Sequence, residues 1–249
     1  MNVRHRFDGP ETAPVLVLAS SLGTTHAMWD ANVETLTRRY RLLRYDHRGH
    51  GGTAVPQEPF AVADMADDVV ELLDGHGIER ASFCGLSLGG AVGQSLARRQ
   101  PERVERLILC CTAAKFGEPA GWEERAQTVR ECGLGAIADA VLERWFTAAQ
   151  RQSQPELVAG FHEAFLATPA EGYARCCEAL RDWDFRAELP AIEVPTVCIA
   201  GDSDPSTPPA ELELLAHEIP DAQLVVLPDA AHLANVAQPE RFAEAVLAA

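Results

Sequence analysis

Short apolar segments alternate with segments of helical periodicity over most of the chain, and this alternation constrains the fold more than any other feature. The apolar runs lie at 14–20, 40–46, 81–85, 104–112, 195–201 and 222–228. Helical patterns separate or follow them at 28–39, 64–77, 88–100, 208–219 and 238–249. Strands this apolar are covered on both faces, which is typical of a parallel sheet between two layers of helices. The sequence therefore predicts an α/β fold with a mostly parallel central sheet and helices on both faces.

One long segment interrupts the alternation. Between about 113 and 189 the sequence has helical patterns and no convincing strand; the patterns lie at 123–133, 136–150, 155–167 and 171–184. Ligands bind an open α/β sheet at the carboxyl ends of its strands, so a helical insert between strands is expected to cover that edge. We predict a core of residues 1–112 and 190–249 and a helical lid of residues 113–189.

The segment Gly85-Leu86-Ser87-Leu88-Gly89 joins an apolar run to a helical pattern and fits the motif G-x-S-x-G. The turn in this motif is so tight that the serine takes a strained backbone conformation, and the glycines leave room for it. The hydroxyl then projects above the sheet, and the N–H of Leu88 points to the same place from a helix N-terminus. The pattern also occurs as a packing turn, but its place between strand and helix favours a nucleophile.

A serine hydroxyl needs a base to become nucleophilic, and the base needs a carboxylate to orient it. After a serine of this motif, the acid and then the histidine follow along the chain. The downstream histidines are His162 in the helical insert, His217 in the helix 208–219, and His232 after the strand 222–228. Only His232 is expected at the carboxyl end of a strand, so we predict that it is the base, although most loop histidines are structural.

Two aspartates after the strand 195–201 compete to orient this histidine. Asp202 directly follows the strand-ending glycine and is suited to capping the turn. Asp204 reaches further into the loop, and Pro205 stiffens the chain behind it. We therefore favour Asp204 as the acid, with Asp202 as the alternative.

An oxyanion hole needs a second N–H donor, from the loop after an early central strand. That loop reads Ser-Ser-Leu-Gly-Thr-Thr over residues 20–25. The N–H of Leu22 is the predicted partner of the Leu88 N–H. The side chains of Ser21 and Thr24 are either substrate contacts or ordinary polar groups of a turn.

Composition argues against several other classes of protein. The formal charge of −16 disfavours non-specific binding to nucleic acid or anionic membranes. No run approaches the roughly 18 apolar residues of a membrane span, and the N-terminus has no apolar block typical of a secretory signal. We therefore expect a cytoplasmic protein whose seven cysteines are reduced and mostly packed. His47 and His50 have no cluster of further ligands beside them, so we predict no metal site. The acidic side chains Asp64, Asp67, Asp68 and Glu71 are predicted to form a solvated face of the helix 64–77.

Nearly the whole chain resembles the α/β-hydrolase superfamily, through Gly85–Gly89 and the stretches "DHRGHGGT", "GDSDPSTP" and "AAHLANVAQPERF". The stretches "DGPETAPVLVLASSLGTTHAMWD", "YDHRGHGGT", "ERWFTAA" and "AAHLANVAQPERF" resemble, more closely, the 3-oxoadipate enol-lactonase family. Members hydrolyse a five-membered enol-lactone to 3-oxoadipate, in the β-ketoadipate pathway of aromatic catabolism, without a cofactor. The resemblance implies an α/β-hydrolase fold with a helical lid inserted after the sixth strand. That family opens with two antiparallel strands; only "NVRHRF" precedes Pro14 here, so we expect the first edge strand to be short or absent.

The resemblance also implies roles for particular residues. It implies a catalytic triad of Ser87 as nucleophile, Asp204 as acid and His232 as base. It further supports Leu22 and Leu88 as the oxyanion donors. The acid of that family lies three residues after the strand-ending glycine, which supports this choice of aspartate.

The substrate of the enol-lactonases is a small lactone that bears a carboxylate, so a cation is expected in the pocket. Trp145 resembles a lid aromatic that closes over the lactone, although a buried helix anchor fits its position equally well. The candidate cations in the insert are Arg144, Arg130, Arg175, Arg181 and Lys115. Of these we name Arg144, with Ser21 and Trp145, as candidate substrate contacts; the sequence does not decide among the cations.

Two other kinds of function stay open. One is a different hydrolase on the same scaffold, such as a general esterase, a C–C bond hydrolase or a perhydrolase. The other is a ligand-binding member of the fold without catalysis, which commonly has a damaged triad. All three triad positions are intact in this sequence, which disfavours the second alternative. The oligomeric state is not predicted.

Overall fold

The computed structural model describes residues 2–249, which form one seven-stranded sheet of order β1-β3-β2-β4-β5-β6-β7. The strands are β1 His5–Asp8, β2 Val15–Ala19, β3 Arg41–Tyr45, β4 Ala81–Leu86, β5 Val104–Cys110, β6 Thr196–Gly201 and β7 Gln223–Leu227. Strand β1 runs antiparallel to β3, and the other neighbouring pairs are parallel. The mostly parallel sheet predicted from the sequence is confirmed.

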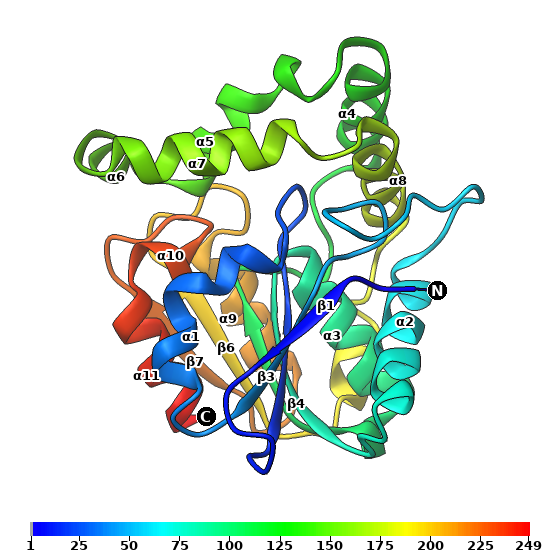
Figure 1. Cartoon of the computed structure of the whole chain (residues 1–249), viewed down its shortest axis with the longest axis vertical. Coiled ribbons are helices and arrows are strands. Elements are labelled where there is room, and N and C mark those ends of the chain that lie inside the picture. Colours follow the sequence, from blue (N-terminus) through cyan, green and yellow to red (C-terminus); the bar gives the residue numbers. More distant parts are fainter. Residues whose placement is uncertain (1) are drawn as a thin grey trace.

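Helices cover both faces of this sheet (Figure 1). Those of the core are α1 Asp30–Leu36, α2 Val62–Gly75, α3 Leu88–Arg99, α9 Pro209–Glu218, α10 Ala234–Ala237 and α11 Pro239–Ala248. Helix α1 packs against α11, and α2 packs against α3. Every residue of the central strands β4 and β6 is buried, whereas the edge strand β7 is partly exposed. This burial explains why the inner strands are mostly apolar.

Within residues 111–195, between β5 and β6, the chain forms five α-helices that lie across the carboxyl ends of the strands (Figure 1). They are α4 Pro119–Cys132, α5 Ala138–Trp145, α6 Ala148–Ser153, α7 Pro155–Leu166 and α8 Ala170–Arg181. The segment 136–150, predicted as one helix, divides because Phe146 is extended (φ −127°, ψ 138°). Thr147 then caps α6 by accepting a hydrogen bond from the N–H of Gln150, 3.1 Å away.

The expectation that the insert follows the sixth strand is wrong, because only β1–β5 precede it in residues 2–110. One strand, β1, precedes β2 within residues 2–14. It is a four-residue strand at the edge of the sheet. The short first strand expected from the sequence is therefore confirmed.

Three further expectations concern single residues or composition. Six of the seven cysteines are buried, all are free thiols, and only Cys132 is exposed, as predicted. No helix within residues 2–249 has the length and apolar character needed to cross a membrane. The prediction that the acidic side chains of α2 are all solvated is wrong for Asp68. This carboxylate is 4% exposed and forms a two-pronged ion pair with Arg48.

Candidate active site

Ser87 occupies the turn between β4 and α3 in a backbone conformation that side chains rarely adopt. Its φ is 58° and its ψ is −115°. A Cβ at Gly85 would lie 2.1 Å from the carbonyl oxygen of Gly89, and one at Gly89 would lie 2.2 Å from that of Ala19. Only glycine fits at these two positions, because the turn packs directly on itself and on β2. The strained turn predicted for G-x-S-x-G is present.

Hydrogen bonds around the turn hold this strained residue in place. The N–H of Ser87 donates to the carbonyl of Cys110 over 2.9 Å. The Thr112 hydroxyl donates to the carbonyl of Ser87 over 2.7 Å. A non-glycine residue with such angles costs about 1–3 kcal/mol and persists only where its surroundings determine it.

His232 and Asp204 lie in contact, although 27 residues separate them in the chain. The Nδ1–H of His232, in the loop after β7, donates to Oδ2 of Asp204, in the loop after β6, over 2.8 Å. Both side chains are almost fully buried, with 5% and 0% of their surface exposed. The bond leaves Nε2 of the imidazole as the free acceptor, the tautomer that a general base requires.

The Asp204 carboxylate accepts three more hydrogen bonds from its own loop. Oδ1 accepts from the N–H of Ser206 at 2.8 Å and from that of Thr207 at 3.2 Å, and Oδ2 accepts from the Thr207 hydroxyl at 2.7 Å. Burial by itself raises the pKa of this carboxyl. The charge and hydrogen bond of His232, with the bonds from Thr207 and Ser206, outweigh burial and hold the pKa below its usual range. The carboxylate is therefore ionised at neutral pH.

Asp202, the alternative acid, has a different set of partners. Its Oδ1 accepts from the Ser203 hydroxyl at 2.8 Å and from the N–H of Ala230 at 3.3 Å. These contacts tie the β6 loop to the β7 loop and do not involve the imidazole. Of the two aspartates, the structure brings Asp204 to His232.

Two backbone N–H groups near the serine are unused. The N–H groups of Leu22 and Leu88 have no acceptor among residues 2–249, whereas those of Gly23, Ser87 and Gly89 are bonded. The N–H of Gly23 donates to His50, and that of Gly89 donates to the carbonyl of Ser20 over 3.1 Å. The second bond ties the Leu22 loop directly to the serine turn. Free N–H donors at such a place are suited to stabilising an oxyanion.

Two buried histidines form hydrogen bonds with the backbone of the Leu22 loop. Nε2–H of His47 donates to the carbonyl of Ser20 over 2.8 Å. Nε2 of His50 accepts from the N–H of Gly23 over 2.9 Å, and its Nδ1–H donates to the carbonyl of Arg48 over 3.1 Å. Burial lowers the pKa of both imidazoles, that of His47 to about 4, so both are neutral near pH 7. Their sequence spacing raised only the question of a metal site. In the structure, both residues instead form hydrogen bonds with the backbone of the loop that carries Leu22.

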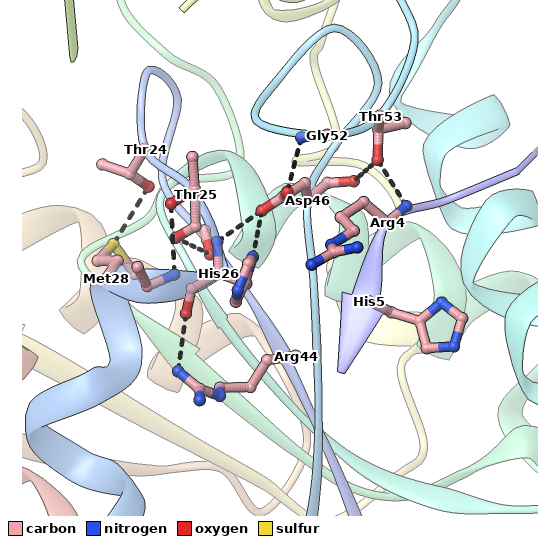
Figure 2. Close-up of polar contacts among 12 residues, drawn as sticks. Arg4, His5, Thr24, Thr25, His26, Met28, Arg44, Asp46, Gly52 and Thr53 are labelled. Carbon is pink, nitrogen blue, oxygen red and sulfur yellow. Dashed lines mark hydrogen bonds and ion pairs between the residues drawn. The ribbon is translucent and has the colours of Figure 1, made fainter. Parts of the chain in front are cut away.

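Asp46 completes the support of this loop (Figure 2). Its Oδ1 accepts from the backbone N–H of His26 at 2.7 Å and from the ring Nδ1 of that residue at 2.8 Å. Its Oδ2 accepts from the N–H of Gly52 at 3.0 Å. Burial opposes ionisation, but these three bonds outweigh it and lower the pKa of Asp46. One carboxylate thus joins the end of the Leu22 loop to the turn after β3.

A cavity of about 510 Å³ lies between the carboxyl edge of the sheet and the helical insert, a size typical of small-molecule sites. Its wall includes most of the candidate residues from the sequence: Ser21, Leu22, Ser87, Arg144, Trp145 and His232. Trp145 is 3% exposed and packs edge-to-face against Phe165, with ring centroids 5.5 Å apart. It is therefore both a buried anchor of α5 and part of the cavity wall.

The structure separates the candidate cations of the insert. Four of them pair with carboxylates: Arg130 with Glu171 and Glu178, Arg175 with Glu171, Arg181 with Glu123 and Asp182, and Lys115 with Glu118. Arg144 lines the cavity and makes no ion pair with any residue from 2 to 249. Sequence reasoning missed Arg125, which also lines the cavity from α4. The only signal for it was the spacing from Trp122, which places both on one face of the helix.

A parallel sheet whose strand-to-helix turn carries a strained serine is the architecture of the α/β hydrolases. The chain belongs to the alpha/beta hydrolase family, whose sequence profile matches residues 16–245.

Relatives within the family share most of this chain. 3-Oxoadipate enol-lactonase 2 of Acinetobacter baylyi is 42% identical over 96% of this chain and 89% of its own length. The crystal structure of the enol-lactonase from Burkholderia xenovorans matches with a TM-score of 0.97 and 42% identity, covering 99% of this chain and 95% of that one. A putative carbamate hydrolase of Agrobacterium fabrum is 31% identical over 92% of this chain and 90% of its own length.

Proposed function

We propose that this protein is a serine hydrolase that opens the lactone ring of 3-oxoadipate enol-lactone to give 3-oxoadipate, without a cofactor. One observation carries the proposal. A single cavity has Ser87 and His232 in its wall, and the imidazole is bonded to the buried carboxylate of Asp204. The similarity to the two enol-lactonases, at 42% identity over nearly the whole chain, supports the choice of substrate. The reaction would then belong to the β-ketoadipate pathway.

In the proposed first step, Nε2 of His232 takes the proton of Ser87 as its Oγ attacks the lactone carbonyl carbon. The negative charge that develops on the carbonyl oxygen is stabilised by the N–H groups of Leu22 and Leu88. Asp204 holds the imidazole in place and stabilises the imidazolium.

Collapse of this intermediate breaks the ring C–O bond while the His232 imidazolium gives its proton to the departing enolate oxygen, and the enol that forms tautomerises to the ketone. An enolate is a good leaving group, so ring opening needs less assistance than cleavage of an alkyl ester. A water molecule then attacks the acyl-enzyme while His232 takes its proton. Breakdown of this second intermediate releases 3-oxoadipate and regenerates Ser87.

We assign the helices of 113–189 the role of a lid over the substrate. Trp145 and Ser21 are proposed to contact the lactone, because both line the cavity that Ser87 also lines. Arg144 is proposed to attract the substrate carboxylate from the mouth, since its side chain is exposed.

Two assays test the proposal. Hydrolysis of p-nitrophenyl acetate that disappears in Ser87→Ala separates a hydrolase from a ligand-binding member of the fold. The value of kcat/KM for 3-oxoadipate enol-lactone, compared with that for the nitrophenyl ester, then tests the substrate. A preference for uncharged esters would refute the lactonase assignment and favour a general esterase. Cleavage of a carbamate in preference to both would favour the activity named for the more distant relative.

A further inference from the structure

Arg125 is a cation in the cavity wall without a counter-charge. It lies on α4, is half-buried, and forms no ion pair with any residue of the described chain, 2–249. Its Nε is fully buried and has no hydrogen-bond partner there. Arg130, five residues later on the same helix, pairs with two glutamates. A partly buried charge left without a partner is costly, so Arg125 requires an explanation that Arg130 does not.

Aromatic rings and one hydroxyl hold the guanidinium of Arg125 in a defined position. Its Cζ lies 5.3 Å from the ring centroid of Trp122 and 5.4 Å from that of Tyr173. Its Nη2–H donates to the hydroxyl oxygen of Tyr173. Tyr173 is itself fixed, since it is fully buried on α8 and packs edge-to-face on Phe165 at 5.5 Å. The charge is therefore preorganised by partners that do not neutralise it.

The tyrosine cannot supply the missing negative charge. Burial raises the pKa of Tyr173, and although the charge of Arg125 opposes this effect, the pKa stays above its usual value. The phenol is thus neutral at any pH at which the protein is expected to work. The neutral tyrosine therefore leaves the positive charge of Arg125 without a counter-charge.

The free donors of Arg125 match a carboxylate. Nη1 has no partner among residues 2–249 and, unlike Nε, is not buried. Together the two Nη groups present parallel N–H bonds, the arrangement that grips both oxygens of a carboxylate. Arg144, on α5, lines the same cavity but is exposed.

Negative side chains also line this cavity, but they are open to solvent. Glu118 and Glu124 are both exposed. Glu118 is 83% exposed and is paired with Lys115 at 3.4 Å. Exposed carboxylates are screened by solvent, so they weaken the attraction of the half-buried Arg125 for an anion only slightly.

We propose that Arg125 binds the carboxylate of the substrate and that Tyr173 positions it, so that this pair sets a preference for lactones with an anionic arm. The inference rests on the proposed lactonase function. It assigns the inner anion contact to α4, whereas the exposed Arg144 acts at the mouth of the cavity.

The test compares two enol-lactones that differ only in the arm on the ring. 3-Oxoadipate enol-lactone carries a carboxymethyl group where α-angelica lactone carries a methyl group. We expect the unaltered enzyme to prefer the carboxymethyl lactone in kcat/KM. Arg125→Met should lower kcat/KM for that lactone by roughly 10- to 100-fold, mainly through KM, and change the value for the methyl lactone by less than about threefold. Arg125→Lys should recover part of the loss.

Tyr173→Phe and Arg130→Met are the matched variants. Tyr173→Phe removes the acceptor of Arg125, so it should raise KM for the carboxymethyl lactone and leave that for the methyl lactone unchanged. Arg130→Met alters the outer face of the same helix and should leave the ratio between the two lactones unchanged. Activity on the methyl lactone reports that each variant is folded.

The outcomes separate the two levels of the proposal. If the unaltered enzyme prefers the carboxymethyl lactone and Arg125→Met keeps that preference, Arg125 is not the anion contact and the lactonase assignment stands. Equal rates on both lactones in the unaltered enzyme would also overturn the anion site. If neither lactone is cleaved while p-nitrophenyl acetate is, the lactonase assignment fails, and the role of Arg125 as its substrate contact fails with it.

Discussion

The backbone N–H of His232 donates a hydrogen bond to the carbonyl oxygen of Arg144, with 3.2 Å between nitrogen and oxygen. The next residue repeats the contact, since the N–H of Leu233 donates to the carbonyl of Trp145 over 3.2 Å. The last carbonyls of a helix lack partners within the helix, and here the loop of the candidate base supplies them. The C-terminus of α5 and the position of His232 are therefore coupled.

This coupling predicts that loosening α5 disturbs catalysis as well as stability. Trp145→Ala removes an indole that packs on Phe165 and Phe161 and should lower the free energy of unfolding by about 3–5 kcal/mol. The value of kcat should fall too, because α5 then holds His232 less firmly. Trp145→Phe keeps most of the packing and should lose less of both. Denaturant unfolding and turnover of p-nitrophenyl acetate measure the two effects; a stable Trp145→Ala variant with full turnover would contradict the coupling.

The two aspartates after β6 should differ sharply in function. Asp204→Asn removes the charge that orients and stabilises the His232 imidazolium and should lower kcat by about 10⁴-fold, as in other triads. Asp202→Asn alters only contacts between loops and should change kcat by less than about threefold. The pair is matched in chemistry and lies within three residues. Comparable losses in both variants would show that the acid has been misassigned.

Replacing Ser87 should separate its backbone strain from its chemistry. Both Ser87→Ala and Ser87→Gly should abolish ester hydrolysis, because neither has a nucleophile. Glycine tolerates φ 58° and ψ −115°, so Ser87→Gly should be about 1 kcal/mol more stable than Ser87→Ala. Thermal or denaturant unfolding of the two variants measures the difference. Equal stability would mean that the turn stores no strain.

His50 should affect turnover without touching substrate. His50→Phe keeps a ring of similar size but removes the acceptor for the N–H of Gly23, so the loop that carries Leu22 loses a fixed point. The unpaired N–H should cost about 1–3 kcal/mol of stability. We expect kcat for p-nitrophenyl acetate to fall roughly 10- to 100-fold with little change in KM, since displacing one oxyanion donor acts on the transition state. His217→Phe, on the exposed side of α9, is the control and should change neither.

The buried histidines should make the fold sensitive to mild acid. The pKa of His47 is about 4 in the folded protein, below the usual 6.5. Between these values the unfolded chain therefore binds more protons than the folded protein. The stability that the folded protein gains by burying His47 in its neutral form is complete above pH 6.5 and is lost as the pH falls toward 4. A gap of this size corresponds to about 3 kcal/mol. His47→Gln retains a donor for Ser20 but does not titrate, and its free energy of unfolding should depend less on pH across this window. An unchanged slope would contradict the assignment.

Below pH 4, protonation of carboxylates is expected to lower the stability further. Asp46 and Asp204 both have lowered pKa values in the folded protein, so the stability they contribute is present above their unfolded pKa and is lost as the pH falls through the folded one. The acid limb of unfolding should therefore extend below pH 4 in His47→Gln as well.

Much of the architecture follows from local sequence. The parallel sheet is predictable because β4 and β6 are buried along their whole length and are therefore mostly apolar. The turn at Ser87 is predictable because only glycine permits the close approaches at Gly85 and Gly89. The order of serine, acid and histidine, combined with the positions of strand ends, pointed to His232 and favoured Asp204 over Asp202. Each of these features depends on the chemistry of a few neighbouring residues or on their place relative to a strand.

Tertiary packing decided the rest, because it determines which face of a helix is turned inward and which distant group meets it. Asp68 belongs to a polar stretch of α2, yet it is buried because Arg48 reaches it from the loop after β3. Arg125 and Arg130 lie on one helix in similar polar surroundings, and the packing of α4 against α8 turned only the first toward the cavity. The sequence by itself determined the sheet, the serine turn and the residues available for chemistry. Only the folded structure decided which charges meet, because contacts between distant segments depend on how whole elements pack and not on local composition.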